Sequence, residues 1–209
     1  MTTDAIGEVI ATREALRAIV GEPADLVMRK DIGRLDEHCR AFIARSPFVL
    51  VGTSGADGFC DVSPRGDAPG FARVLDERTL VLPERPGNKR TDTLTNIIDN
   101  PQVGLLFLVP GVEETLRVNG RARVVRDSAL LASMAVNNKP PLLAIVVEVR
   151  ESYLHCAKAF KRARLWDADS QVLRTELPSL ARIIYDQLQL DCELDDLERG
   201  LAEGYKKLY

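Results

Sequence analysis

The chain has 209 residues, of which 45% are hydrophobic and 28% charged, a composition typical of an ordinary soluble globule. Its formal net charge of -3 disfavours a dedicated nucleic-acid binder, because such proteins usually carry a basic surface that neutralises phosphates. The N-terminus lacks the pattern of a secretory signal, and no apolar run approaches the roughly 20 residues that span a bilayer, so we expect a cytoplasmic protein without membrane or nucleic-acid partners.

A helical arm is predicted at the start of the chain. Apolar residues recur at helical spacing over residues 4–20, among them Ile6 and Val9, and the same pattern returns over residues 33–45. We therefore expect a single domain over residues 1–209, with a helical arm at 1–46, a β-rich core at 47–150 and a helical region at 151–209.

From residue 48 the hydrophobic period changes to that of strands. Residues 48–53 and 59–63 flank a turn at 54–58 and predict a hairpin. Further strands are predicted at 74–75, 79–82, 103–109, 115–126 and 142–149. Short strands with few intervening helices favour a closed antiparallel barrel over a doubly wound sheet, so the expected fold class is mainly β with flanking helices (α+β).

The loop of residues 83–90 is the most informative stretch, because it places two cations where a helix is predicted to begin. Asn88 is a good N-cap residue, and apolar residues follow it at helical spacing up to residue 99. Lys89 and Arg90 would then lie in the first turn, where acidic side chains are usual. A bound phosphate would resolve this conflict, while a solvated helix start is the alternative.

Other familiar site patterns are missing from the sequence. There is no Gly-x-x-x-x-Gly-Lys-Ser/Thr loop, no Gly-x-Gly-x-x-Gly after a strand and no Gly-x-Ser-x-Gly elbow, which disfavours nucleoside triphosphates, adenine dinucleotides and serine hydrolysis. Two histidines, His38 and His155, lie in segments predicted to be helical and lack partners at ligand spacing, so no metal site is expected. Four widely spaced cysteines are interpreted as reduced, mostly buried thiols: Cys39, Cys60, Cys156 and Cys192.

The region after residue 151 is predicted to be helical. Ser152 is a candidate cap of a basic helix that runs to Arg164, and further helices are predicted at 177–190 and 194–208. The cations at positions 158, 161, 162 and 164 form the densest basic run of the chain. They indicate either a solvated helix face or a second contact to an anionic ligand, which a partner subunit could supply.

In this order the segments resemble the pyridoxamine 5'-phosphate oxidase-like family, the FMN-binding split barrels, over about residues 48–149. The resemblance is carried by the strand at 79–82, the basic triplet at 88–90, the run Asn-Pro-Gln-Val that begins at 100, and the strand at 116–122. It implies an antiparallel split β-barrel with N-terminal and C-terminal helical extensions. It also implies that the basic pair Lys89 and Arg90 holds the phosphate of FMN and that Asn88 is a further cofactor-binding residue.

The segment Ser63-Pro64-Arg65-Gly66 resembles a flavoprotein subgroup of this family, in which it lies along the isoalloxazine edge with the arginine over the pyrimidine oxygens. A fixed guanidinium there favours reduced flavin, which gathers negative charge near its pyrimidine ring. The resemblance implies further flavin contacts from Pro83, Glu84, Thr115, Arg162 and Trp166, the last two from a second subunit.

The resemblance thus implies an FMN-dependent oxidoreductase that carries two electrons between a reduced donor such as NAD(P)H and an unidentified small-molecule acceptor. It also implies a homodimer with flavin sites between subunits. Vitamin B6 oxidation is not expected, because Arg164-Leu165-Trp166-Asp167 replaces the Arg-x-His pair of the true oxidases. The alternatives are a non-catalytic flavin carrier or sensor, or a split barrel using F420 or haem, for which only His38 or His155 could supply an imidazole ligand.

Overall fold

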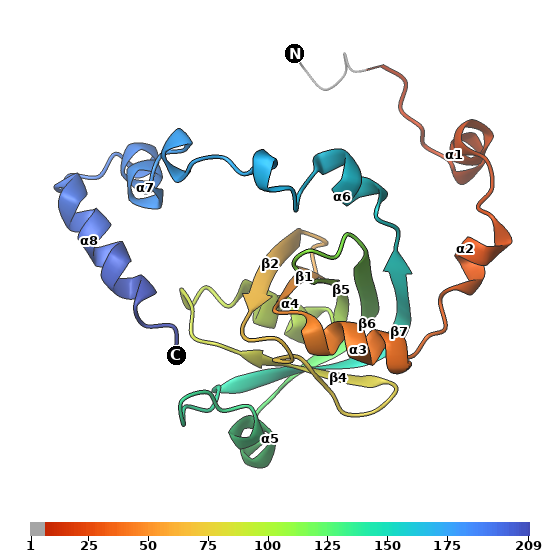
Figure 1. Ribbon diagram of the computed structural model, residues 1–209, viewed down its shortest axis with the longest axis horizontal. Helices are drawn as coiled ribbons and strands as arrows, with labels where there is room; N and C mark the ends of the chain where they lie inside the picture. Colours follow the sequence, from red (N-terminus) through yellow and green to blue (C-terminus); the bar gives the residue numbers. More distant parts are fainter. Residues whose placement is uncertain (1–6) are drawn as a thin grey trace. The chain divides into compact units, whose positions relative to one another are not determined.

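The computed structural model describes residues 7–209 of the chain, which divide into two compact units between Ile32 and Gly33 (Figure 1). The described part of the first unit holds α1 (Arg13–Val20) and α2 (Asp25–Arg29). The first helix begins later than the predicted residue 4, because Thr12 caps it by accepting a hydrogen bond from the Ala15 amide. The predicted helical positions 4–6 lie outside the described residues.

The second unit contains the predicted β-rich core and the helices that follow it. Its strands are β1 (Phe48–Ser54), β2 (Cys60–Gly66), β3 (Arg73–Val74), β4 (Thr79–Glu84), β5 (Gln102–Leu108), β6 (Thr115–Val125) and β7 (Leu143–His155). Its helices are α3 (Glu37–Arg45), α4 (Asp92–Asp99), α5 (Ser128–Ser133), α6 (Lys158–Ala163), α7 (Leu180–Leu188) and α8 (Leu194–Tyr205), with 3-10 turns η2 (Ala168–Ser170) and η3 (Arg174–Glu176).

All seven strands belong to one antiparallel sheet in the order β2-β1-β5-β6-β7-β4-β3. The sheet curls into a barrel, but no ladder joins its first strand to its last, so the barrel is split and not closed. This confirms the predicted α+β split barrel with flanking helices. Closure of the sheet, which the short strands suggested, is wrong, because β2 and β3 end the sheet without pairing to each other.

The core lies between the inner sheet face and α3, which packs against β3 and β6. In β1 the side chains alternate, with Val49 and Val51 buried and their neighbours partly exposed, as expected of a strand with one wet face. In β4 the alternation disappears. Leu80 and Leu82 face the main core, while Val81 packs on the other side against α5, which explains the continuous apolar run.

Several predicted boundaries are wrong around residue 152. Ser152 does not cap a helix; it is buried within β7, and its hydroxyl donates to the Arg34 carbonyl. The strand continues through His155, which is therefore not helical, and α6 begins only at Lys158. The cysteines also differ from expectation, because Cys39 is buried while Cys60, Cys156 and Cys192 are exposed. No helix in the described residues 7–209 is long and apolar enough to cross a membrane.

Candidate functional site

The candidate site lies at the split of the barrel, the opening between β2 at one end of the sheet and β4 and β3 at the other end. Four strands separate β2 from β4 in the sheet order, yet Arg65 at the end of β2 meets Glu84 at the end of β4. The Arg65 Nε donates to Glu84 Oε2 at 3.0 Å, and its Nη1 donates to the Pro64 carbonyl at 3.0 Å. The two paired side chains are only 17% and 22% exposed. The structure therefore brings these two predicted flavin residues together and orients the guanidinium.

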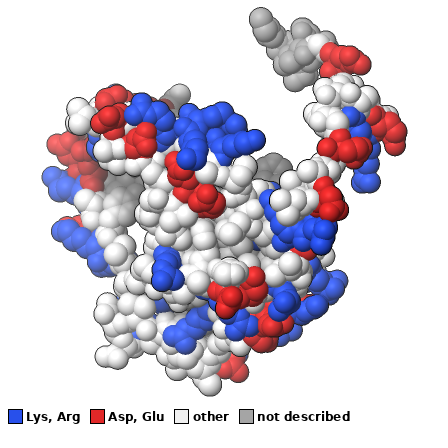
Figure 2. Space-filling model, turned by 45° about the vertical axis from the view of Figure 1, so that its right-hand side comes forward, with Lys and Arg blue, Asp and Glu red and all other residues white. Residues whose placement is uncertain are grey.

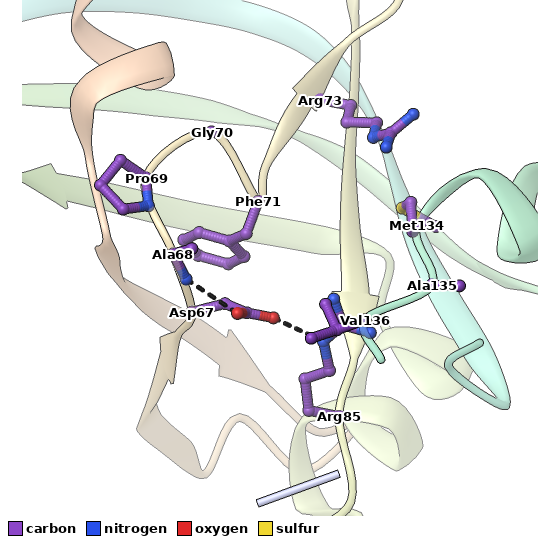
Figure 3. A pocket seen from close by; sticks show the side chains of 10 residues that line it. All are labelled: Asp67, Ala68, Pro69, Gly70, Phe71, Arg73, Arg85, Met134, Ala135 and Val136. Carbon is purple, nitrogen blue, oxygen red and sulfur yellow. Dashed lines mark hydrogen bonds and ion pairs between the residues drawn. The ribbon is translucent and has the colours of Figure 1, made fainter. Parts of the chain in front are cut away.

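A second ion pair crosses the same split with reversed polarity. Asp67, one residue beyond β2, accepts a hydrogen bond of 2.7 Å from Arg85 Nε, one residue beyond β4 (Figure 3). The Asp67 side chain is 2% exposed and that of Arg85 14%. Burial of a charged pair is costly unless its polar atoms are well paired. The two pairs together join regions of the sheet that no backbone ladder connects.

The Asp67 carboxylate is supplied with three hydrogen-bond donors. Burial alone would raise its pKa, but donation from the Tyr209 hydroxyl, the Ala68 amide and Arg85 outweighs burial and holds the pKa below its ordinary value. Tyr209 shows the reciprocal effect, since its hydrogen bond to the carboxylate, followed by burial, raises the pKa of the phenol. Asp67 therefore stays ionised near neutral pH, and Tyr209 stays protonated.

A small cavity of about 150 Å³ opens beside this second ion pair. The loop after β2 forms one wall, and the segment after α5 forms the other (Figure 3). The lining residues are Asp67, Ala68, Pro69, Gly70, Phe71, Arg73, Arg85, Met134, Ala135 and Val136. Arg73 of β3 donates to the hydroxyl and the carbonyl of Ser133, the last residue of α5, and these hydrogen bonds link the two sides of the cavity.

The basic loop, defined as residues 85–91, leads from this ion pair into α4. The helix begins at Asp92, so the prediction that Asn88 caps it is wrong. Asn88 Oδ1 accepts from the Arg90 amide at 3.0 Å, which shapes the loop before the helix. Lys89 and Arg90 therefore precede the first turn, which carries the acidic Asp92, so the charge conflict inferred from the sequence does not arise.

Two residues of the basic loop have left-handed backbone conformations. Lys89 has φ of 63° and Thr91 has φ of 60°, a region that costs most non-glycine residues about 1–2 kcal/mol. The two cations of the loop, Lys89 and Arg90, are exposed. Arg90 pairs with Asp92 at 2.8 Å, which raises the pKa of the guanidinium, whereas Lys89 forms no ion pair with the described residues. Strain that persists in a loop with an unpaired cation is typical of a ligand-binding segment.

The helix after the basic loop is anchored to the edge of the sheet. Asn96 Nδ2 donates to Asp61 Oδ2 at 2.6 Å and to Thr53 Oγ1 at 3.1 Å. Asn100 Nδ2 donates to Ser54 Oγ at 2.8 Å. These contacts fix α4 against β1 and β2, so the basic loop is held between two anchored points: this helix and the Asp67–Arg85 pair.

The other predicted residues on the two strands fit the split to different degrees. Pro64 and Gly66 are exposed on β2, whose position at the sheet edge tolerates a proline, and Ser63 is partly buried. Pro83 is buried in β4. All four thus lie on the two strands that border the split.

The remaining predicted residues lie on other elements. Thr115 is buried at the start of β6, opposite His155. Trp166 donates its Nε1 hydrogen to the Val112 carbonyl at 2.8 Å, and its ring lies 5.5 Å from that of Phe160. Arg162 is exposed on α6. Within the chain, Trp166 thus contacts the β5–β6 loop and α6, and flavin contacts of Arg162 and Trp166 from a second copy stay a prediction.

Part of the dense basic run is neutralised locally. Lys161 pairs with Glu113 at 2.9 Å and Arg164 with Asp167 at 2.7 Å. In the view of Figure 2, acidic and basic residues are interspersed around a largely uncharged centre, without a continuous basic surface on that face.

Sequence reasoning missed three residues of this site: Asp67, Arg85 and Tyr209. Asp67 directly follows the segment Ser63–Gly66, and Arg85 lies in the loop of residues 83–90, but nothing in their spacing shows that they pair across the barrel. Tyr209 is 142 positions away from Asp67, and its hydrogen bond to that residue has no local sequence signal.

The family model for pyridoxamine 5'-phosphate oxidase matches residues 35–156, which include α3 and all seven strands. Among curated proteins, none is similar enough to the chain to count as a relative.

Among solved structures, a candidate pyridoxamine 5'-phosphate oxidase from Lactobacillus delbrueckii is 23% identical, with a TM-score of 0.46, over 59% of this chain and 98% of its own. An F420 reductase is 20% identical, with a TM-score of 0.41, over 56% and 94%. HutZ, the heme storage protein from Vibrio cholerae, is 15% identical, with a TM-score of 0.41, over 58% and 94%.

Proposed function

Because the chain belongs to the pyridoxamine 5'-phosphate oxidase family, we propose that it binds FMN and acts as an oxidoreductase. The cofactor would carry two electrons between a reduced donor such as NAD(P)H and a small-molecule acceptor. The observation that carries this proposal is the arrangement at the split, where Arg65 and the basic loop lie at the ends of β2 and β4.

The basic loop supplies the phosphate contacts. Lys89 is exposed and lacks an ion-pair partner among residues 7–209, so its ammonium group can bind an anion without breaking an existing pair. Arg90 can turn from Asp92 to the phosphate at small cost, because an ion pair on an exposed surface is only weakly stabilising. The contacts of Asn96 fix α4 to β1 and β2 and so restrain the loop that carries both cations.

Arg65 supplies the electrostatics at the ring. FMN supplies the two-electron chemistry when bound, while the protein holds the ring and compensates the charge that reduction adds. Two contacts, to Glu84 and to the Pro64 carbonyl, fix the Arg65 guanidinium before any ligand arrives. Glu84 offsets part of its positive charge, so this pair would set how strongly the site favours reduced flavin.

A homodimer is part of the proposal. The outward face of β2, β1 and β5 is apolar over neighbouring positions: Phe48, Leu50, Val62, Pro64, Leu106 and Leu108. Val62 is 65% exposed and Phe48 37%. A contiguous apolar sheet face of this kind is typical of a protein interface, and a second copy of the chain would cover it by two-fold symmetry.

The phosphate assignment predicts that replacing both Lys89 and Arg90 with alanine weakens FMN binding at least about a hundredfold, because two charge-assisted contacts contribute about 1.5 kcal/mol or more each. The measurement is a titration of the apo protein followed by flavin fluorescence. The double variant Arg123→Ala with Arg126→Ala removes two exposed cations elsewhere and is expected to bind FMN normally. Unchanged affinity in the Lys89 and Arg90 variant would refute the phosphate site.

The absorption spectrum of the protein as purified separates FMN from the alternatives F420 and haem. His38 is exposed on α3 beside Glu37, and His155 lies in β7 with its ring 5.0 Å from that of Tyr153. Neither histidine belongs to the split, which favours a flavin over haem there. Reduction of the bound flavin by NADH or NADPH then separates an enzyme from a carrier or sensor.

A further inference from the structure

The final residue of the sequence contacts both partners of the second ion pair at the split. The Tyr209 hydroxyl donates to Asp67 Oδ1 at 2.7 Å, and the Arg85 guanidinium lies 5.5 Å from the centroid of the phenol ring. Lys139, in the segment between α5 and β7, donates from Nζ to the Tyr209 main-chain oxygen at 3.1 Å. Three separate parts of the chain therefore hold this residue.

These contacts complete a buried ion pair. In Figure 3, Asp67 accepts hydrogen bonds from the Ala68 amide, which follows it in the same loop, and from the Arg85 guanidinium. One carboxylate oxygen can still accept a hydrogen bond from another donor. Tyr209 fills that position from outside the barrel, and its ring covers the guanidinium. A buried charged pair stabilises a structure only when such remaining hydrogen-bonding capacity is satisfied.

The pair in turn controls the start of the basic loop. Arg85 is the first residue of this loop, and Lys89 and Arg90 follow within five positions. The far end of the loop is fixed by α4 through Asn96 and Asp61. If the Asp67–Arg85 pair loosens, the nearest fixed point before the loop is Glu84, which β7 and Arg65 hold, so Arg85 is released and the cations that follow it sample more positions.

We propose that Tyr209 is a positioning residue for the flavin phosphate: by completing the Asp67–Arg85 pair across the split, it holds the basic loop in the conformation that binds the cofactor. This inference rests on the proposed flavin function and adds a role for the C-terminal residues in the same chain. Because coupling between two binding events is reciprocal, bound FMN stabilises the docked segment 206–209 as much as that segment favours FMN.

The test compares Tyr209→Ala, Tyr209→Phe and the control Tyr205→Ala. Tyr205 lies on α8 and is 65% exposed, so its replacement removes a tyrosine from the same region without touching the split. Each variant is titrated with FMN and with riboflavin, which has the ring but lacks the phosphate. Hydrogen exchange of residues 85–91 and 206–209 is measured with and without FMN.

We expect Tyr209→Ala to weaken FMN binding about tenfold, because it removes both the hydrogen bond to Asp67 and the ring beside Arg85. Riboflavin binding should stay the same, and exchange in both segments should rise. Tyr209→Phe keeps the ring over Arg85 and should lose less affinity. Tyr205→Ala should match the wild type.

The outcomes separate the two proposals. A wild-type protein that binds neither flavin refutes the proposed function and this inference with it. Normal FMN binding together with equal affinity and equal exchange in Tyr209→Ala refutes the positioning role alone. Equal losses of FMN and riboflavin affinity would also refute it, because a general structural role does not distinguish the phosphate from the ring.

Discussion

At the scale of single residues, the basic loop owes its shape to unusual backbone conformations. The side chain of Asn88 accepts a hydrogen bond from the backbone amide of Arg90, and Lys89 and Thr91 have positive φ values. Thr91 is β-branched, so its left-handed conformation is less favourable than that of an asparagine or glycine. Because of these conformations, the helix begins only at Asp92, and Lys89 and Arg90 remain in the loop. There, both side chains can approach the same ligand.

Replacing Thr91 with glycine should stabilise the protein by about 1 kcal/mol, because glycine takes the left-handed conformation without steric cost and the strain removed exceeds the entropy lost. Chemical denaturation measures the change. Thr95→Gly is the matched control, since Thr95 is exposed within α4 and its replacement should destabilise the helix by about 0.3 kcal/mol. A destabilised Thr91→Gly variant would show that the loop is not strained.

At the scale of elements, the barrel is shaped by an irregularity between its two longest strands. The register of β6 and β7 shifts between Asn119 and Gly120, where β7 carries an extra residue. Such a bulge bends and twists a strand, which lets the sheet curl until β2 and β4 approach. A methyl group on Gly120 would lie far inside van der Waals contact with the Glu148 carbonyl oxygen, so only glycine fits this position.

We expect Gly120→Ala to destabilise the protein by about 2–3 kcal/mol, because the strands must separate to accept the methyl group. The measurement is the free energy of unfolding. Gly200→Ala serves as the control, since this position in α8 has open space and alanine should stabilise the helix by about 0.5–1 kcal/mol. A Gly120→Ala variant as stable as the wild type would contradict the close approach.

At the scale of the whole molecule, the split barrel places charged pairs and an apolar face close together. Arg65 and Glu84 meet at the split, while Pro64, next in sequence to Arg65, belongs to the outward apolar face of β2. A dimer built on that face would bring a second copy close to the proposed flavin site. In such a dimer, Arg162 and Trp166 of the second copy would supply the flavin contacts that the resemblance implies.

The proposed homodimer predicts that Leu106→Lys produces a monomer, because the charge falls within the apolar face, on β5 opposite Leu50 and beside Arg117 of β6, and adds a second cation there. Sedimentation measures the mass. Leu188→Lys, at an exposed position at the end of α7, should leave the dimer intact. If Leu106→Lys sediments like the wild type, the interface lies elsewhere.

Although it did not indicate α2 or α5, the sequence by itself determined most of the strands and helices and the antiparallel barrel class, and it singled out the segments proposed for the site. It could do so because hydrophobic periodicity, turn residues and the basic loop are local signals. Tertiary structure alone decided that the sheet stays split, that α4 begins at Asp92 and that β7 runs on to His155. It also decided that Asp67 pairs with Arg85 and receives a hydrogen bond from Tyr209. These features depend on contacts between residues far apart in the chain, and such contacts exist only after the sheet has curled.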